Sequence, residues 1–233
     1  MREIVFDTET TGLDNKVDRI IEIGCVELEN QFPTGRSLHL FINPDGRAVH
    51  PDALAVHGIT DQFLADKPVF ADLADEIAAF FDGAHYVAHN ANFDMGFLNA
   101  EFDRIGLPPV DPGLVIDTLA LARRRHPMGP NSLDALCRRY GIDNAHRTKH
   151  GALLDAELLT DVYIEMRGGR QAALGLSSDE AGNKTEESET VVAEIGERPA
   201  QLPERLTACD LDAHSTLVKR IGADALWLKG NRT

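Results

Sequence analysis

The chain has 233 residues, of which 43% are hydrophobic, and a formal net charge of −15. This length and apolar content suit one sizeable packed domain with some chain left over, and they exclude a wholly disordered protein. The acidic balance argues against a stand-alone nucleic-acid binder, because Lys and Arg contacts to phosphate supply most non-specific affinity.

The first part of the chain alternates strand and helix signals, which predicts an α/β fold. Apolar runs predict strands at residues 4–6, 20–28, 38–42, 86–88 and 114–116. Apolar spacing and cap residues predict helices at residues 51–56, 70–81, 93–105, 131–140 and 151–166. The links between the first three strands are too short for helical crossovers, so these strands are predicted to form an antiparallel meander.

The sequence changes character after Gly169. Residues 177–200 are rich in Ser, Glu, Thr and Gly, which predicts a disordered linker. Residues 206–228 regain apolar side chains, including the only tryptophan, Trp227, but this segment is too short for a core of its own. We therefore predict a domain at 1–169, a flexible linker at 170–200 and a partner-binding segment at 201–233.

The cysteines and the first residues indicate the compartment. The three cysteines are far apart and show no metal-type spacing, which argues against disulfides or a zinc site and favours a reducing compartment. Only three apolar residues precede Asp7, so we expect no signal peptide, and no apolar run is long enough to span a bilayer. We predict a cytoplasmic protein with no membrane segment.

An acidic pair directly follows the first apolar run, in the segment Asp7-Thr8-Glu9. Side chains two apart on a strand share a face, so Asp7 and Glu9 are predicted to point together while Thr8 points away. Two such carboxylates repel each other unless a cation lies between them, and a divalent ion with oxygen ligands would fit. A solvated strand end with two alternating acids is the competing interpretation, and the pair alone does not decide between them.

Two later segments carry acids close to histidines. One runs from His89 to Asp94, where a predicted strand meets a helix, and the other runs from His150 to Asp155, at the start of the last predicted helix. Positions five apart on a helix differ by roughly 140° of rotation. His150 and Asp155 therefore converge only if His150 lies in the loop before the first turn, and Gly151 favours that placement.

These three segments, taken in order, resemble the three exonuclease motifs of the DEDDh family of 3′–5′ exonucleases. Residues 56–59, 131–137 and 147–156 are further similar to one branch of that family, the proofreading epsilon subunits of bacterial DNA polymerase III. The resemblance is good over residues 2–167 and weak beyond them. It implies an RNase H-like fold, with an antiparallel meander plus parallel strands flanked by helices.

The resemblance also implies a site with two divalent metal ions, Mg²⁺ or Mn²⁺, ~3.5–4 Å apart. Asp7 would bridge the two ions, Glu9 and Asp155 would complete the first metal site, and Asp94 would act on the second. Asp94 also fits a helix N-terminal acid that the helix dipole favours. His150 would be the general base, because a histidine accepts a proton near neutral pH.

The resemblance implies that Asp7, Glu9 and Asp155 also contact the nucleotide, together with two further residues. Asp52 and His57 are similar to the nucleotide-contacting segment of the family, although His57 fits equally well as a C-terminal helix residue before Gly58. We expect His89 to stabilise a turn rather than to bind metal, and the arginine run at 123–125 to be a solvated face.

A short peptide after the domain resembles the Gln-x-x-Leu-x-Leu/Phe motif that binds sliding clamps. Its matching residues are Gln171, Leu174 and Leu176, but Gly175 and the missing final aromatic residue depart from the pattern. The segment beyond it would dock on the polymerase, with Trp227 as a candidate anchor.

The function implied is a proofreading 3′–5′ exonuclease that removes mispaired 3′-terminal nucleotides during replication. Its implied partners are DNA 3′ ends, the polymerase catalytic (alpha) subunit, the clamp and a small theta-like subunit. Residues 1–167 hold 27 acidic and 15 basic residues, a net charge of −12, so we expect a partner to deliver the DNA. Two alternatives are a free-standing exonuclease on RNA or oligonucleotide ends and an adaptor between polymerase and clamp.

Overall fold

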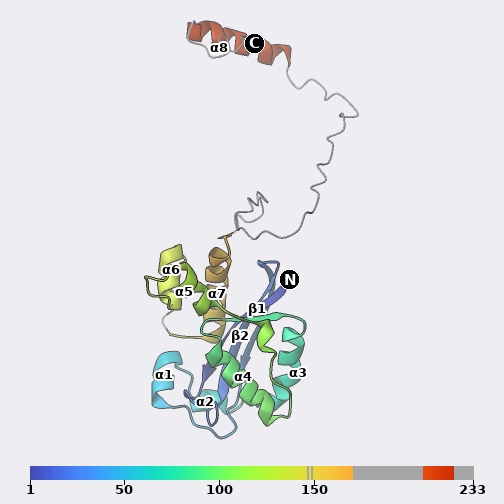
Figure 1. Ribbon diagram of the computed structural model, residues 1–233, viewed down its shortest axis with the longest axis vertical. Helices are drawn as coiled ribbons and strands as arrows, with labels where there is room; N and C mark the ends of the chain where they lie inside the picture. Colours follow the sequence, from blue (N-terminus) through green and yellow to red (C-terminus); the bar gives the residue numbers. More distant parts are fainter. Residues whose placement is uncertain (146, 148, 170–206, 223–233) are drawn as a thin grey trace, which may run out of the picture. The chain divides into compact units, whose positions relative to one another are not determined.

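The computed structural model describes residues 1–145, 147, 149–169 and 207–222 (Figure 1). Residues 1–169 contain a five-stranded sheet with the strand order β3-β2-β1-β4-β5. The strands are β1 (Arg2–Thr10), β2 (Ile20–Glu29), β3 (Phe32–Phe41), β4 (His85–Ala88) and β5 (Val115–Asp117). β1, β2 and β3 pair antiparallel, whereas β4 pairs parallel with both β1 and β5. The predicted α/β fold with a mixed sheet is therefore confirmed.

Helices cover the sheet and connect its strands. They are α1 (Pro51–His57), α2 (Asp61–Leu64), α3 (Phe70–Phe81), α4 (Asn92–Arg104), α5 (Thr118–Arg125), α6 (Leu133–Tyr140) and α7 (Ala152–Met166). The structure also contains two short elements that the sequence did not predict, α2 and a 3₁₀ turn at Pro112–Leu114. It differs from prediction again at α5, where the exposed arginine run forms the last turn of a helix. β3 begins earlier than predicted. Its first half is exposed and lacks an apolar pattern, so no sequence signal indicated a strand there.

The two faces of β1 meet different helices. Ile4 and Phe6 belong to the core that α3 and α4 close, while Val5 packs in a second cluster with Tyr163 of α7. Figure 1 shows α7 lying along β1 and β2. Because the side chains alternate, Asp7 and Glu9 continue the Val5 row toward α7, whereas Thr8 continues the Phe6 row toward α4.

A glycine in β2 lets α7 approach the sheet closely. Gly24 is the cross-strand partner of Asp7, and a Cβ atom added to it would lie 2.1 Å from the backbone nitrogen of Leu153. No side chain therefore fits between β2 and the first turn of α7. This contact sets the distance between β1 and the residues of that turn, including Asp155.

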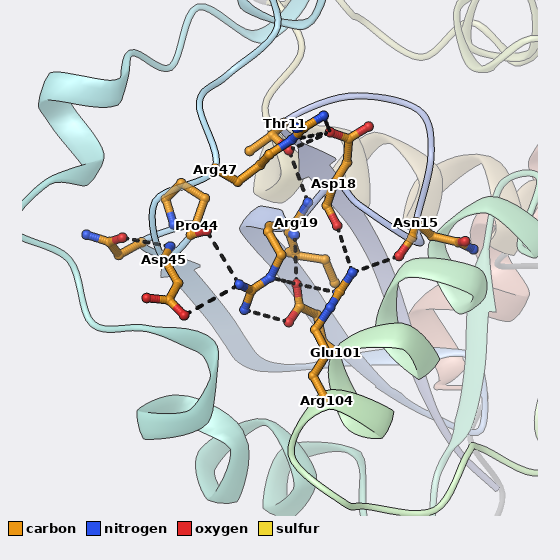
Figure 2. Close-up of polar contacts among 11 residues, drawn as sticks. Thr11, Asn15, Asp18, Arg19, Pro44, Asp45, Arg47, Glu101 and Arg104 are labelled. Atoms are coloured by element: carbon orange, nitrogen blue, oxygen red, sulfur yellow. Dashed lines mark hydrogen bonds and ion pairs between the residues drawn. The ribbon is translucent and has the colours of Figure 1, made fainter.

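A buried ion-pair network fixes the loop between β1 and β2 (Figure 2). Nε and Nη2 of Arg19 donate to the two carboxylate oxygens of Glu101 at 2.8 and 3.0 Å. Arg104 also pairs with Glu101, at 3.2 Å, and donates to the carbonyl oxygen of Asn15 at 2.9 Å. Because Glu101 is fully buried, these contacts hold the loop that follows Glu9 against α4.

The C-terminal segment is described only at residues 207–222. Residues Ala208–Ile221 form α8, which starts with a capping box between Thr207 and Asp210. The apolar side chains of Leu211, Leu217 and Ile221 are exposed. No described helix is long and apolar enough to cross a membrane.

Several predictions fall on residues whose structure is not described. The clamp-like residues Gln171, Leu174 and Leu176, the whole predicted linker at 170–200 and Trp227 lie outside the described residues. The chain divides into the units Met1–Ser177 and Ser178–Thr233. The boundaries at 169 and 200 stay a prediction.

Replacing Gly24 with Ala tests the approach of α7 to the sheet. The new Cβ would overlap backbone atoms of Leu153, so we expect the free energy of unfolding to fall by about 1–3 kcal/mol in urea denaturation. Gly151→Ala is the matched control, because no atom lies within 4 Å of its added Cβ and its φ of −155° suits any residue. Equal stability of the two variants would contradict the proposed contact.

Candidate active site

A cleft of about 310 Å³ opens where β1 ends. It gathers the three predicted motifs, which contribute Asp7 and Glu9 from β1, Asp94 from α4, His150 from the loop before α7 and Asp155 from the first turn of α7. Glu9, Asp94 and Asp155 are buried, Asp7 is half-buried and His150 is exposed. The structure thus brings together all five residues expected to carry the chemistry.

Asp94 joins the site through Thr8. One carboxylate oxygen of Asp94 accepts from the backbone nitrogen of Thr8 at 3.1 Å and from its hydroxyl at 2.7 Å. Asp94 also lies in the first turn of α4, so the helix dipole favours it, as the competing interpretation states. The helix-end interpretation is compatible with a metal ligand, because both hydrogen bonds from Thr8 go to Oδ1 of Asp94 and leave Oδ2 for a metal ion.

His150 lies in the loop directly before α7, as predicted, since Gly151 is the N-cap of this helix. Its backbone nitrogen donates to the carbonyl oxygen of Val56 at 3.3 Å, which ties the loop to α1. Its Nδ1 lies 3.4 Å from Oδ2 of Asp155. One potential ligand atom from each of Glu9, His150 and Asp155 lies within 4.8 Å of the others, so this group could hold a metal ion.

Arg147 also lines the cleft and was assigned no role from the sequence. Its Nε and Nη2 donate to the two oxygens of Asp155 at 2.5 and 2.6 Å, and its Nη1 donates to Asp134 at 2.8 Å. Nη2 also lies 2.9 Å from Nδ1 of His150. The available signal was a basic residue three positions before the histidine of the third motif.

Crowding and burial change the acid strength of the carboxyl groups. Burial first, and then the charges of Asp94, Asp155 and Glu9, raise the pKa of Asp7 well above its usual value, while Arg147 opposes this rise. Burial first, with Glu22 as the strongest like charge, raises the pKa of Glu9 to about 8.

The pKa of the Asp94 carboxyl group is raised as well. Burial raises the pKa of Asp94 to about 7, although the hydrogen bonds from Thr8 act in the opposite direction. Carboxylates that repel one another in a buried cleft are stabilised by a cation, and carboxylate oxygen is the ligand that Mg²⁺ and Mn²⁺ prefer. The donor set therefore fits divalent metal ions.

A second cavity of about 460 Å³ adjoins the cleft and shares Thr8, Glu9 and Phe93 with it. Asp52 and His57, the predicted nucleotide-contacting residues, both line this second cavity. His57 is also the last residue of α1 before Gly58, as the helix-end interpretation predicts, while its contact with a nucleotide stays a prediction. Its Nδ1 accepts from the backbone of Ile59 at 3.0 Å, and its buried Nε2 has no hydrogen-bond partner among the described residues.

His89 lines the first cleft but makes structural contacts. Its Nδ1 lies 2.9 Å from the hydroxyl of Thr118, and its Nε2 lies 2.9 Å from the carbonyl oxygen of Asn131. These bonds connect the end of β4 to the starts of α5 and α6. This geometry agrees with the expectation that His89 stabilises a turn.

The chain belongs to the exonuclease family whose model, RNase_T, matches residues 4–163. The DNA polymerase III subunit epsilon of Salmonella typhimurium is 43% identical over 238 residues, covering 97% of each chain. The subunit of the same name from Haemophilus influenzae is 51% identical over 176 residues, covering 72% of this chain and 68% of that one.

A solved structure supports the same assignment. Exonuclease X in complex with 5′-overhanging duplex DNA is 31% identical, with a TM-score of 0.55, and the match covers 71% of this chain and 89% of that chain. The expected resemblance to exonucleases and the RNase H-like arrangement of the sheet are confirmed.

The raised pKa of Glu9 predicts how stability depends on pH when metal is removed. The folded state binds a proton up to about pH 8, whereas the unfolded side chain loses it near 4.5, so the folded state holds more protons between these values. Stabilisation by the protonated form is therefore complete below about pH 4.5 and is lost as the pH rises through about 8. Melting temperatures in EDTA should fall across this window in the wild type and fall less in Glu9→Gln. If melting temperature falls with pH equally in the two proteins, the raised pKa of Glu9 is refuted.

Proposed function

We propose that the protein is a metal-dependent 3′–5′ exodeoxyribonuclease and the proofreading subunit of a replicative DNA polymerase. The observation that carries the proposal is the convergence of four carboxylates and one histidine in a single cleft of an exonuclease-family fold. The relatives named DNA polymerase III subunit epsilon, one of which matches over 97% of this chain, support the assignment to replication.

The side chains of the proposed site divide into metal ligands and residues that orient them. Asp7, Glu9 and Asp155 would hold the first of two divalent ions, Mg²⁺ or Mn²⁺, and Asp94 together with Asp7 would hold the second. Bound there, the ions would make water a nucleophile near neutral pH and stabilise charge on the leaving 3′ oxygen. Thr8 keeps Asp94 oriented through its two hydrogen bonds, and the close contact at Gly24 keeps α7 at the required distance from β1.

His150 is proposed as the general base, which takes a proton from the attacking water. Its position in a loop at the mouth of the cleft supports this role, because the side chain is half exposed and reachable by water. Asp52 and His57 would contact the terminal nucleotide from the adjoining cavity. That cavity also carries the exposed apolar side chain of Leu13, which suits contact with a base.

The proposed partners follow from the charge and from the segment beyond the domain. DNA 3′ ends would be presented by the polymerase catalytic subunit, which residues 201–233 would bind, because the domain is too acidic to retain DNA by itself. The exposed apolar side chains of α8 support a partner for this segment. Binding of a clamp through Gln171, Leu174 and Leu176, binding of a small theta-like subunit and a cytoplasmic location stay predictions.

Digestion of a labelled primer tests the function directly. We expect Mg²⁺-dependent release of 5′-mononucleotides, faster from a mispaired than from a paired DNA 3′ end and faster still with the polymerase subunit present. Asp7→Ala should fold normally and lose about 10³-fold in rate, since charge stabilisation by metal ions is worth several kcal/mol. Near-wild-type digestion by this variant would refute the site, and preference for an RNA primer would favour a free-standing exonuclease instead.

His150→Ala separates a base from a metal ligand. Loss of a general base should lower kcat by about 10²–10⁴-fold and leave Mn²⁺ affinity, measured by calorimetry, nearly unchanged. If Mn²⁺ affinity falls together with kcat, His150 is instead a metal ligand, acting together with Glu9 and Asp155.

A further inference from the structure

Arg147 is the arginine that lines the cleft together with the four carboxylates and His150. Its side chain is only 8% exposed, and it makes hydrogen bonds to Asp155, Asp134 and His150. The proposed mechanism needs two of these partners free of Arg147: Asp155 as a metal ligand and His150 as the general base. The third, Asp134, is not part of the proposed machinery.

The contact with Asp155 competes with metal binding. The guanidinium group holds both carboxylate oxygens, at 2.5 and 2.6 Å, in the bidentate geometry that gives arginine–carboxylate pairs their strength. A cation that takes either oxygen must weaken this pair, because two positive groups cannot share the same carboxylate without repulsion.

The contact with His150 restrains the proposed base. Arginine only donates, so Nδ1 of His150 accepts from Nη2 at 2.9 Å. A neutral imidazole then carries its proton on Nε2. Neither nitrogen is free to take a proton from water in this arrangement.

The contact with Asp134 offers Arg147 a place to remain when Asp155 is taken. Asp134 lies in the first turn of α6 and is half exposed, with its Oδ1 2.8 Å from Nη1 of Arg147. The side chain of Asn144 donates to the same carboxylate oxygen at 3.1 Å and helps to orient it.

We propose that Arg147 is a displaceable counter-ion, which neutralises Asp155 and restrains His150 in the metal-free enzyme, and which releases both while keeping its hydrogen bond to Asp134 when divalent cations bind. The inference rests on the proposed function, because it takes Asp155 to be a metal ligand. It makes Arg147 a positioning residue, whose release from Asp155 accompanies assembly of the site.

Calorimetric titration of the full-length protein with Mn²⁺ tests this inference without an activity assay. Arg147→Gln should bind Mn²⁺ about fivefold or more tightly than the wild type, the coupling expected when two ligands compete for one group. Asp134→Asn should bind more weakly, because the displaced arginine loses its second partner. The double variant should match Arg147→Gln within about twofold, since Asp134 then has no arginine to receive. Arg36→Gln, which removes an exposed arginine paired with Glu27 outside the cleft, controls for net charge and should leave the affinity unchanged.

The outcomes separate the inference from the function on which it rests. Unchanged or weaker binding by Arg147→Gln would overturn the counter-ion role while wild-type binding leaves the proposed function standing. Additive effects in the double variant would also overturn it, because they would show two independent charges rather than one moving side chain. Absence of Mn²⁺ binding in the wild type would overturn the proposed metal site itself.

Discussion

Repulsion among carboxylates in one largely buried cleft is the constraint on which the rest of this structure depends. Asp7, Glu9, Asp94 and Asp155 meet where β1 ends, and burial together with neighbouring negative charge makes the ionised forms of Asp7, Glu9 and Asp94 costly. Such a group persists in a folded protein only if a cation or bound protons offset the charge. In the described structure the nearest cation is Arg147, which is paired with Asp155.

The fold supplies the rigidity that this arrangement requires. Alternation along β1 sends Asp7 and Glu9 toward α7 and Thr8 toward α4, so that one strand orients acids from both sides of the sheet. Gly24 admits the first turn of α7 against β2, and the buried pair of Arg19 with Glu101 fixes the following loop (Figure 2). The acids are therefore held together partly by packing and ion pairs that do not involve the acids themselves, and partly by hydrogen bonds to them, such as those from Thr8 to Asp94.

Much of this could be predicted from the sequence, because the relevant signals are local. The alternation at Asp7 and Glu9 and the glycine after His150 gave the direction of each side chain correctly, and the order of the motifs indicated a nuclease. The helix α5 was missed, since its arginine run hides the apolar spacing. Arg147 was missed for another reason: its partner Asp134 lies on another helix, α6, and only the folded loop before α7 brings the two together.

The positions of divalent ions in a crystal grown with Mn²⁺ and a 5′-mononucleotide test the central claim most directly. Anomalous scattering should place two Mn²⁺ ions among the four carboxylates, with the phosphate of the nucleotide beside them. Mn²⁺ bound elsewhere, or a cleft in which the carboxylates contact no metal at saturating concentration, would contradict the account.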